Sequence, residues 1–119
     1  MTTLEESLSR FLDLPGVTTV ALVDAVTGLT YSVVGEAGEM EDGIECAELT
    51  TLVTERLCEA GATGDLESVI VTTTSRYHAL HVMRRQGEPL LITATLDRQR
   101  SNLALAVRSL TDHAEDVLA

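Results

Sequence analysis

Positive charge and aromatic side chains are both scarce in this sequence of 119 residues. Eight basic residues stand against nineteen acidic ones, which gives a formal net charge of −11, and Trp is absent. A field of that sign repels nucleic acid and anionic lipid. One Phe and two Tyr are also too few to build a platform for stacked bases. The composition therefore predicts no nucleic-acid partner.

Long hydrophobic runs are also missing. The longest uncharged apolar run is Val17–Val23, whereas a helix that spans a bilayer needs roughly 20 residues. The first ten residues lack the cationic start and apolar stretch of a signal peptide. We expect no membrane insertion and a cytoplasmic location. With 45% hydrophobic residues, the length fits a single domain over residues 1–119.

Cysteine is limited to Cys46 and Cys58, which fall within one predicted helix. At the helical rise they lie about 18 Å apart, too far to form a disulfide. Both are expected to be buried and to serve as small apolar residues. No cluster of further ligands accompanies them, so the sequence predicts neither a metal site nor a cofactor.

The period of the apolar residues changes several times along the chain, and this succession is the main structural signal. A short helix opens at a Thr3–Glu6 capping box, and one longer helix separates a strand pair from a three-stranded meander. Asp97 is expected to cap the last helix. The predicted strands are Val17–Asp24, Leu29–Val34, Val69–Thr74, Tyr77–Arg84 and Leu90–Leu96, and the longer helix is Ile44–Ala60, which ends at Gly61.

The helix Ile44–Ala60 has two uncharged faces, which is more than packing against one sheet requires. Its main apolar arc, expected to lie on the sheet, consists of Cys46, Leu49, Val53, Leu57 and Ala60. A second arc carries only small residues, a pattern that allows another helix to approach closely. The members of this small stripe are Ala47, Thr50, Thr51, Thr54 and Cys58.

Catalytic motifs are absent from the sequence. His78 and His81 are separated by three positions, which places them on opposite faces of a strand. A hydrolase that uses Ser75 with His78 is the least favoured hypothesis, because the spacing matches no known nucleophile motif. The sequence therefore predicts that the protein is not an enzyme.

The succession of elements resembles that of the roadblock/LC7 domain family over nearly the whole chain. The local pieces that match best are P-G-V-T-T-V-A-L-V-D at Pro15–Asp24, the helix Ile44–Ala60, E-S-V-I-V-T-T-T-S-R-Y at Glu67–Tyr77 and L-L-I-T-A-T-L-D at Leu90–Asp97. The resemblance implies an α/β (α+β) sandwich of order α-β-β-α-β-β-β-α, with one five-stranded antiparallel sheet and helices on both faces. It also implies homodimers that pair the third strand and the second helix across a two-fold axis.

The residues point to the same dimer by a separate route. The strand Val69–Thr74 carries no charge and no Pro, so it is an aggregation hazard if it lies uncovered at a sheet edge. A two-fold dimer would cover both this strand and the small stripe. In the alternative, a monomer, the strand is interior and the stripe is merely exposed. The expected dimer interface consists of Ala47, Thr51, Thr54, Cys58, Val69, Val71 and Thr73.

The leading functional hypothesis follows from the resemblance, which implies scaffolds or regulators that serve small Ras-like GTPases or motor and signalling complexes. The basic residues are all Arg, which hints at a bacterial source and favours a signalling complex over a motor. The alternative is a small ligand-sensing domain of the PAS or profilin-like type, with a pocket between sheet and helix. The few aromatic residues and the lack of converging polar residues disfavour that alternative.

Overall fold

The computed structural model describes residues 3–36, 43–84, 89–114 and 117. The chain begins with the helix α1 (Leu4–Ser9) and the 3₁₀ helix η1 (Arg10–Asp13), which are followed by β1 (Val17–Asp24) and β2 (Thr30–Gly35). The long helix α2 (Gly43–Glu59) then leads to the last three strands and a final helix. These are β3 (Ser68–Thr72), β4 (Arg76–Arg84), β5 (Pro89–Asp97) and α3 (Leu103–His113).

The five strands form one antiparallel sheet in the order β2-β1-β5-β4-β3. β1 pairs with β5 in the middle of the sheet, where Val20 lies opposite Ala94 and Leu22 opposite Ile92. The last three strands form the predicted meander. The predicted five-stranded antiparallel sheet is confirmed, and β3 lies at one of its edges.

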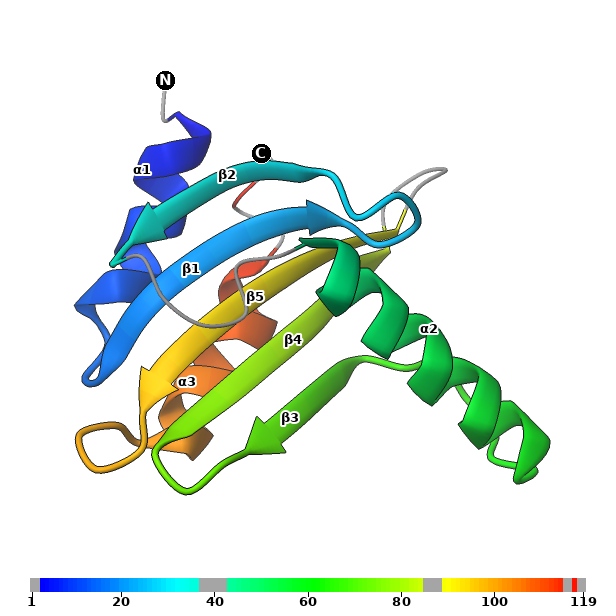
Figure 1. Cartoon of the computed structure of the whole chain (residues 1–119). Helices are drawn as coiled ribbons and strands as arrows, with labels where there is room; N and C mark the ends of the chain where they lie inside the picture. Colours follow the sequence, from blue (N-terminus) through cyan, green and yellow to red (C-terminus); the bar gives the residue numbers. More distant parts are fainter. Residues whose placement is uncertain (1–2, 37–42, 85–88, 115–116, 118–119) are drawn as a thin grey trace.

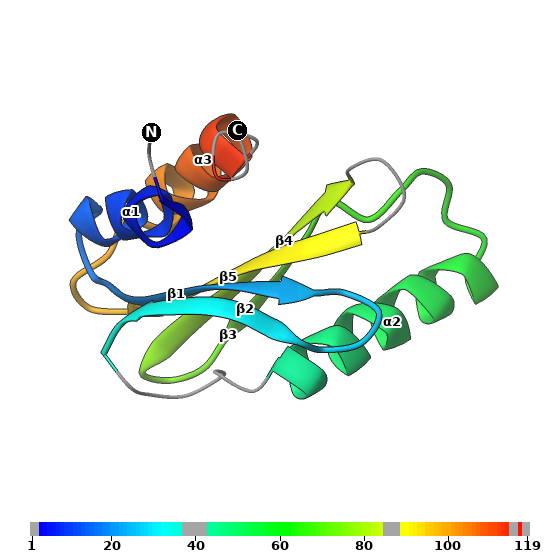
Figure 2. The same cartoon turned by 90° about the horizontal axis from the view of Figure 1, so that it is seen from above.

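Helices cover both faces of the sheet, as expected for the sandwich (Figure 2). On one face, Leu8 and Phe11 from α1 and η1 and Leu110 from α3 pack with Leu22 and Ile92 in the larger apolar cluster. On the other face, where α2 lies (Figure 2), a smaller cluster joins α2 to β1, β4 and β5. The buried members of this smaller cluster are Ala21, Val23, Cys46, Leu80, Val82 and Leu91.

The capping box at the start of α1 and the glycine after α2, both predicted from the sequence, are present in the structure. The Thr3 hydroxyl accepts a hydrogen bond from the Glu6 amide at 3.1 Å, and the Glu6 carboxylate accepts one from the Thr3 amide at 3.4 Å, so the capping box is confirmed. Gly61 follows α2 with a φ of +83°, as a C′ residue requires.

The predicted cap of the last helix is wrong. Asp97 is the final residue of β5, and its carboxylate accepts a hydrogen bond from the Gln99 amide in the turn that follows. Asn102 caps α3 instead, because its side chain accepts a hydrogen bond from the Leu105 amide at 3.1 Å. Both residue types suit an N-cap, so the sequence pattern alone did not separate them.

Gly28 fixes the approach of α2 to the β1–β2 turn. Its φ is +78°, and a Cβ at this position would lie 2.5 Å from the Ile44 Cα at the start of α2. Gly61 has a similar φ of +83°, but a Cβ there would meet nothing within 4 Å. The two glycines therefore share the conformational requirement and differ in their surroundings.

We expect Gly28→Ala to destabilise the fold much more than Gly61→Ala. The left-handed backbone should cost about 1–2 kcal/mol in each variant. The contact with the backbone of Ile44 should add about 1–3 kcal/mol in Gly28→Ala alone. Urea denaturation of both variants measures the difference, and equal losses would contradict the close packing of the turn on α2.

Candidate interaction surface

The helix α2 extends beyond the sheet, so only its first half is covered. Cys46, Ala47 and Thr50 are buried, whereas in the second half every residue except the half-buried Val53 is exposed. Leu57, for example, is 42% exposed. Figure 1 shows the end of the helix projecting past the edge of the sheet. The expectation that the whole apolar arc lies on the sheet is therefore wrong for Leu57 and Ala60.

The edge strand β3 lies on the same side of the molecule as this projecting half. Val69 and Val71 are half-buried, and their register opposite Leu80 and His78 places them on the α2 face of the sheet. Ile70 points to the other face and is 36% exposed. No charged residue and no Pro interrupts Ser68–Thr72. The strand therefore lacks the charged and Pro residues that commonly prevent pairing with another strand.

The residues predicted for the dimer interface occupy three different environments. Ala47 is only 5% exposed, so it packs within its own chain. Thr51, Thr54 and Cys58 are exposed on α2, and the exposure of Cys58 shows that the prediction of two buried thiols is wrong. Thr73 follows the end of β3, where its hydroxyl accepts a hydrogen bond from the Arg76 amide at 3.0 Å in the turn to β4.

The small stripe of α2 does not lie directly beside β3. Thr51 and Thr54 line a hollow of about 430 Å³ together with Arg84 and Pro89 at the ends of β4 and β5. None of the described residues that line it belongs to β3. Leu49, from the apolar arc, packs against the same cluster as Val69. The apolar arc is thus the side of α2 that continues toward β3.

Leu52 and Leu57 are exposed apolar residues in the projecting half of α2, and the helical pattern predicted neither of them to be exposed. They are 47% and 42% exposed, respectively. The pattern assigned Leu57 to the buried arc because a helical wheel takes no account of where the sheet ends. The sequence did contain one sign of this exposure. Leu57 is in register with the apolar arc, but it lies near the C-terminal end of a long helix.

The histidines and Ser75 do not form an accessible catalytic pair. Ser75 is exposed in the β3–β4 turn, whereas His78 is 4% exposed within β4. His81 lies on the opposite face, as predicted, and its burial lowers the pKa of its imidazole, partly opposed by the Glu67 charge. In the part of the chain that the structure describes, no group of acidic, His and Cys side chains is arranged to hold a metal ion.

The β1–β2 turn, which packs against the start of α2, is held by one carboxylate. Asp24 Oδ1 accepts hydrogen bonds from the amides of Val26 at 2.8 Å and Thr27 at 3.0 Å, and the Tyr31 hydroxyl donates to Oδ2 at 3.2 Å. The amide of Thr27, followed by that of Val26, lowers the pKa of Asp24 because these bonds favour the ionised form. The charged carboxylate therefore stabilises the turn against which α2 begins.

Comparison with known proteins establishes the class of fold. No protein-family model matches the sequence, and no curated protein matches it. Among solved structures, a roadblock/LC7 domain from Streptomyces avermitilis superposes with a TM-score of 0.81 at 19% identity, covering 98% of this chain and 95% of that one. The chain thus has the roadblock/LC7 fold, as the sequence resemblance implied.

Two proteins of Myxococcus xanthus share this fold. MglB superposes with a TM-score of 0.74 at 11% identity over 97% of this chain and 94% of its own. MglC gives a TM-score of 0.60 at 16% identity, covering 93% and 92% of the two chains.

The helices within the described residues are all too short or too polar to span a bilayer.

We expect the stability that Asp24 contributes to depend on pH. Because its pKa is lower in the folded chain, the contribution is complete above the ordinary carboxyl pKa and is lost as the pH falls through the lowered value. Asp24→Asn should therefore be less stable than the unmodified protein at pH 7, and the difference should shrink in acid. Urea denaturation at pH 7 and pH 3 measures both.

The exposed Asp65, which has no hydrogen bond or ion pair among the described residues, provides the matched control. Asp65→Asn should leave the free energy of unfolding nearly unchanged at both pH values. A difference between Asp24→Asn and the unmodified protein that stays constant with pH would contradict a role for the ionised carboxylate.

Proposed function

We propose that this protein is a non-enzymatic, cytoplasmic homodimer that scaffolds or regulates a small Ras-like GTPase in a signalling complex. The observation that carries the proposal is that an edge strand without charged residues, β3, and the exposed second half of α2 lie on the same side of the fold. The roadblock/LC7 fold supports it, since the sequence resemblance to that family implies both the dimer and the GTPase partner.

The strand component of the interface is the outer edge of β3. Alternate residues of an edge strand point their N–H and C=O groups away from the sheet, and a second copy of the same strand can satisfy these groups. An antiparallel pair related by a two-fold axis uses the same residues from both copies. Val69 and Val71 would then lie close to the axis, and Thr73 at the margin of the pairing.

The helix component is the second half of α2. Thr51, Thr54 and Cys58 are exposed there and can contribute to the interface as first expected, and the exposed Leu57 joins them. Burying Leu57 against a second copy would recover hydrophobic free energy that a single chain leaves unused. Ala47 supports this surface from within, because it is already buried by its own chain.

The outer face of α2 gives the expected chemistry of the GTPase contact. Glu48 and Glu55 line a hollow of about 290 Å³ together with the apolar Val26, Ile44 and Leu52. Ile44 is 54% and Val26 74% exposed. In a chain with a net charge of −11, such a surface suits a partner that presents basic and apolar groups together.

The dimer is tested with Val71→Lys, which should keep the fold and yield a monomer. Two added charges would face each other across the axis, and like charges on paired strands are unfavourable. Multi-angle light scattering should give a mass near 12.8 kDa for the variant and twice that value for the unmodified protein.

Val33→Lys is the matched control, because Val33 is a 43% exposed valine on the same face of the other edge strand, β2. It should remain dimeric. A Val71→Lys protein that is still a dimer, or a Val33→Lys protein that is a monomer, would overturn the assignment of the interface to β3.

The partner is tested by affinity capture of the tagged protein from a lysate of its own source organism. We expect a small GTPase to be enriched, and its binding to the purified dimer to differ between the GDP form and a GTP-analogue form in biolayer interferometry. A homodimer that retains no GTPase would contradict the regulatory role and would favour the ligand-sensing alternative.

One observation favours that alternative function. A cavity of about 290 Å³ lies between α1–η1 and α3, lined by apolar and polar side chains together. It is on the face of the sheet opposite α2 (Figure 2). A ligand there would leave the β3 edge accessible, so ligand sensing and dimer formation are compatible in this fold.

A further inference from the structure

The cavity between α1–η1 and α3 has features that packing alone does not require. Arg10 and His113, which line it, are exposed, so the cavity is open to solvent. Here the two helices share one face of the sheet but leave about 290 Å³ between them. Ser7 and Ser109 are small residues that line the cavity from opposite sides. Their size explains why the space is not filled by the chain itself.

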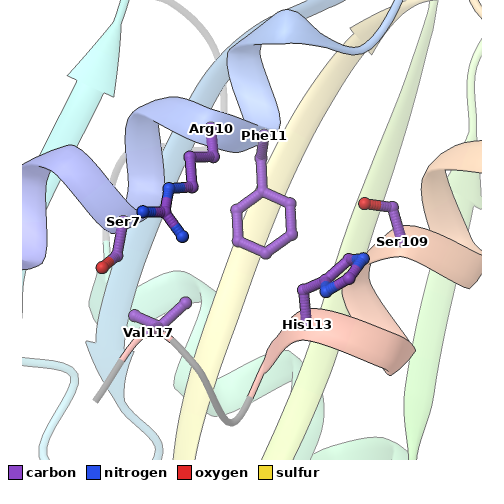
Figure 3. A pocket seen from close by; sticks show the side chains of 6 residues that line it. All are labelled: Ser7, Arg10, Phe11, Ser109, His113 and Val117. Atoms are coloured by element: carbon purple, nitrogen blue, oxygen red, sulfur yellow. The ribbon is translucent and has the colours of Figure 1, made fainter. Parts of the chain in front are cut away.

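The polar groups of the cavity come from both helical segments. Figure 3 shows Ser7 and Arg10 on one side, Ser109 and His113 on the other, and the Phe11 ring between them. Phe11 is 3% exposed and Val117 5% exposed, so the base of the cavity is apolar. An apolar base with a few converging donors is the usual composition of a small-molecule site.

The charge of the cavity is opposite to that of the protein. The Arg10 guanidinium forms no ion pair or hydrogen bond with any described residue, although acidic residues outnumber basic ones by more than two to one in the sequence. Arg presents a planar set of donors that matches a carboxylate, and the Ser7 and Ser109 hydroxyls can add further donors. The geometry therefore favours an anionic group near Arg10.

We propose that this cavity binds a small organic carboxylate, with its carboxylate at Arg10 and its apolar part against Phe11 and Val117. The volume lies at the lower end of ligand pockets, which span roughly 300–1,000 Å³, so the ligand has the size of a benzoate or a short fatty acid. Bound there, it contacts both helical segments of this face at once. The site does not depend on the proposed dimer or on a GTPase.

Benzoate and hexanoate are the probes, and benzamide and hexanamide are their uncharged counterparts. Ligands of this size reach dissociation constants of about 1 mM. At 10 mM, either carboxylate should raise the melting temperature of the full chain by about 3–6 °C at constant ionic strength. The amides should give no comparable shift. Equal shifts for acids and amides, or none for either, would overturn the proposal.

Three variants separate the site from a general salt effect. Arg10→Ala removes an exposed side chain and should weaken benzoate binding at least tenfold, by the loss of the charged pair. Arg100→Ala is the matched control, since Arg100 is also exposed and does not line the cavity. Ser109→Leu fills the cavity and should abolish binding without lowering the melting temperature.

Amide chemical shifts in a ¹⁵N-labelled sample give the location directly. Titration with benzoate should move the signals of Ser7, Phe11, Ser109 and His113, and leave those of β3 and the end of α2 in place. Saturable shifts confined to other elements, or binding unchanged in both Arg10→Ala and Ser109→Leu, would overturn the assignment of the site to this cavity.

Discussion

The pairing of β1 with β5 is the contact on which the rest of the structure depends. It joins the early strand pair to the late meander across more than half of the chain, and it does so in the centre of the sheet. A two-stranded hairpin alone is at best marginally stable in water. Once paired, Val20 and Leu22 lie beside Ala94 and Ile92 on one face, and Val23 beside Leu91 on the other. Both apolar clusters are built on this junction.

The same junction decides which strands are left at the edges, and the two edges are not equivalent. β2 lies at one end of the sheet, where α1 packs alongside it. β3 lies at the other end, and α2, the nearest helix on its face, projects beyond it (Figure 1). The two edges of the sheet thus differ in the helix that lies nearest, which is α1 at β2 and α2 at β3.

The sequence predicted the elements well because their signals are local. Alternating and β-branched runs predicted all five strands to within about two residues at each end, and the capping box and Gly61 marked helix ends correctly. The position of β3 at an edge could be stated only as a condition, because strand order is set by contacts between distant segments. Asp97 and Asn102 both suit a cap, and the choice depends on the length of the turn after β5.

The interaction surface was harder to predict than the fold. The helical wheel separated the small stripe of α2 from its apolar arc, but it carried no information on how far the sheet extends beneath the helix. Leu57 and Cys58 therefore differ from expectation, whereas Cys46 matches it. The cavity near Arg10 was invisible in the sequence, because it arises from the spacing of two helices that are almost a full chain length apart.

The projecting half of α2 links local folding to association. The segment from Thr51 to Glu59 is shorter than the roughly 12–15 residues at which isolated helices become marginally stable in water. Within one chain it is held mainly by continuity with the covered first half and by the cap at Gly61, whose amide donates to the Cys58 carbonyl at 3.1 Å. Any molecule that covers Leu57 adds apolar burial to this segment. The free energy needed to open the last turns of α2 therefore rises when this surface is occupied. Hydrogen exchange of the amides in these turns should accordingly slow when a molecule binds there.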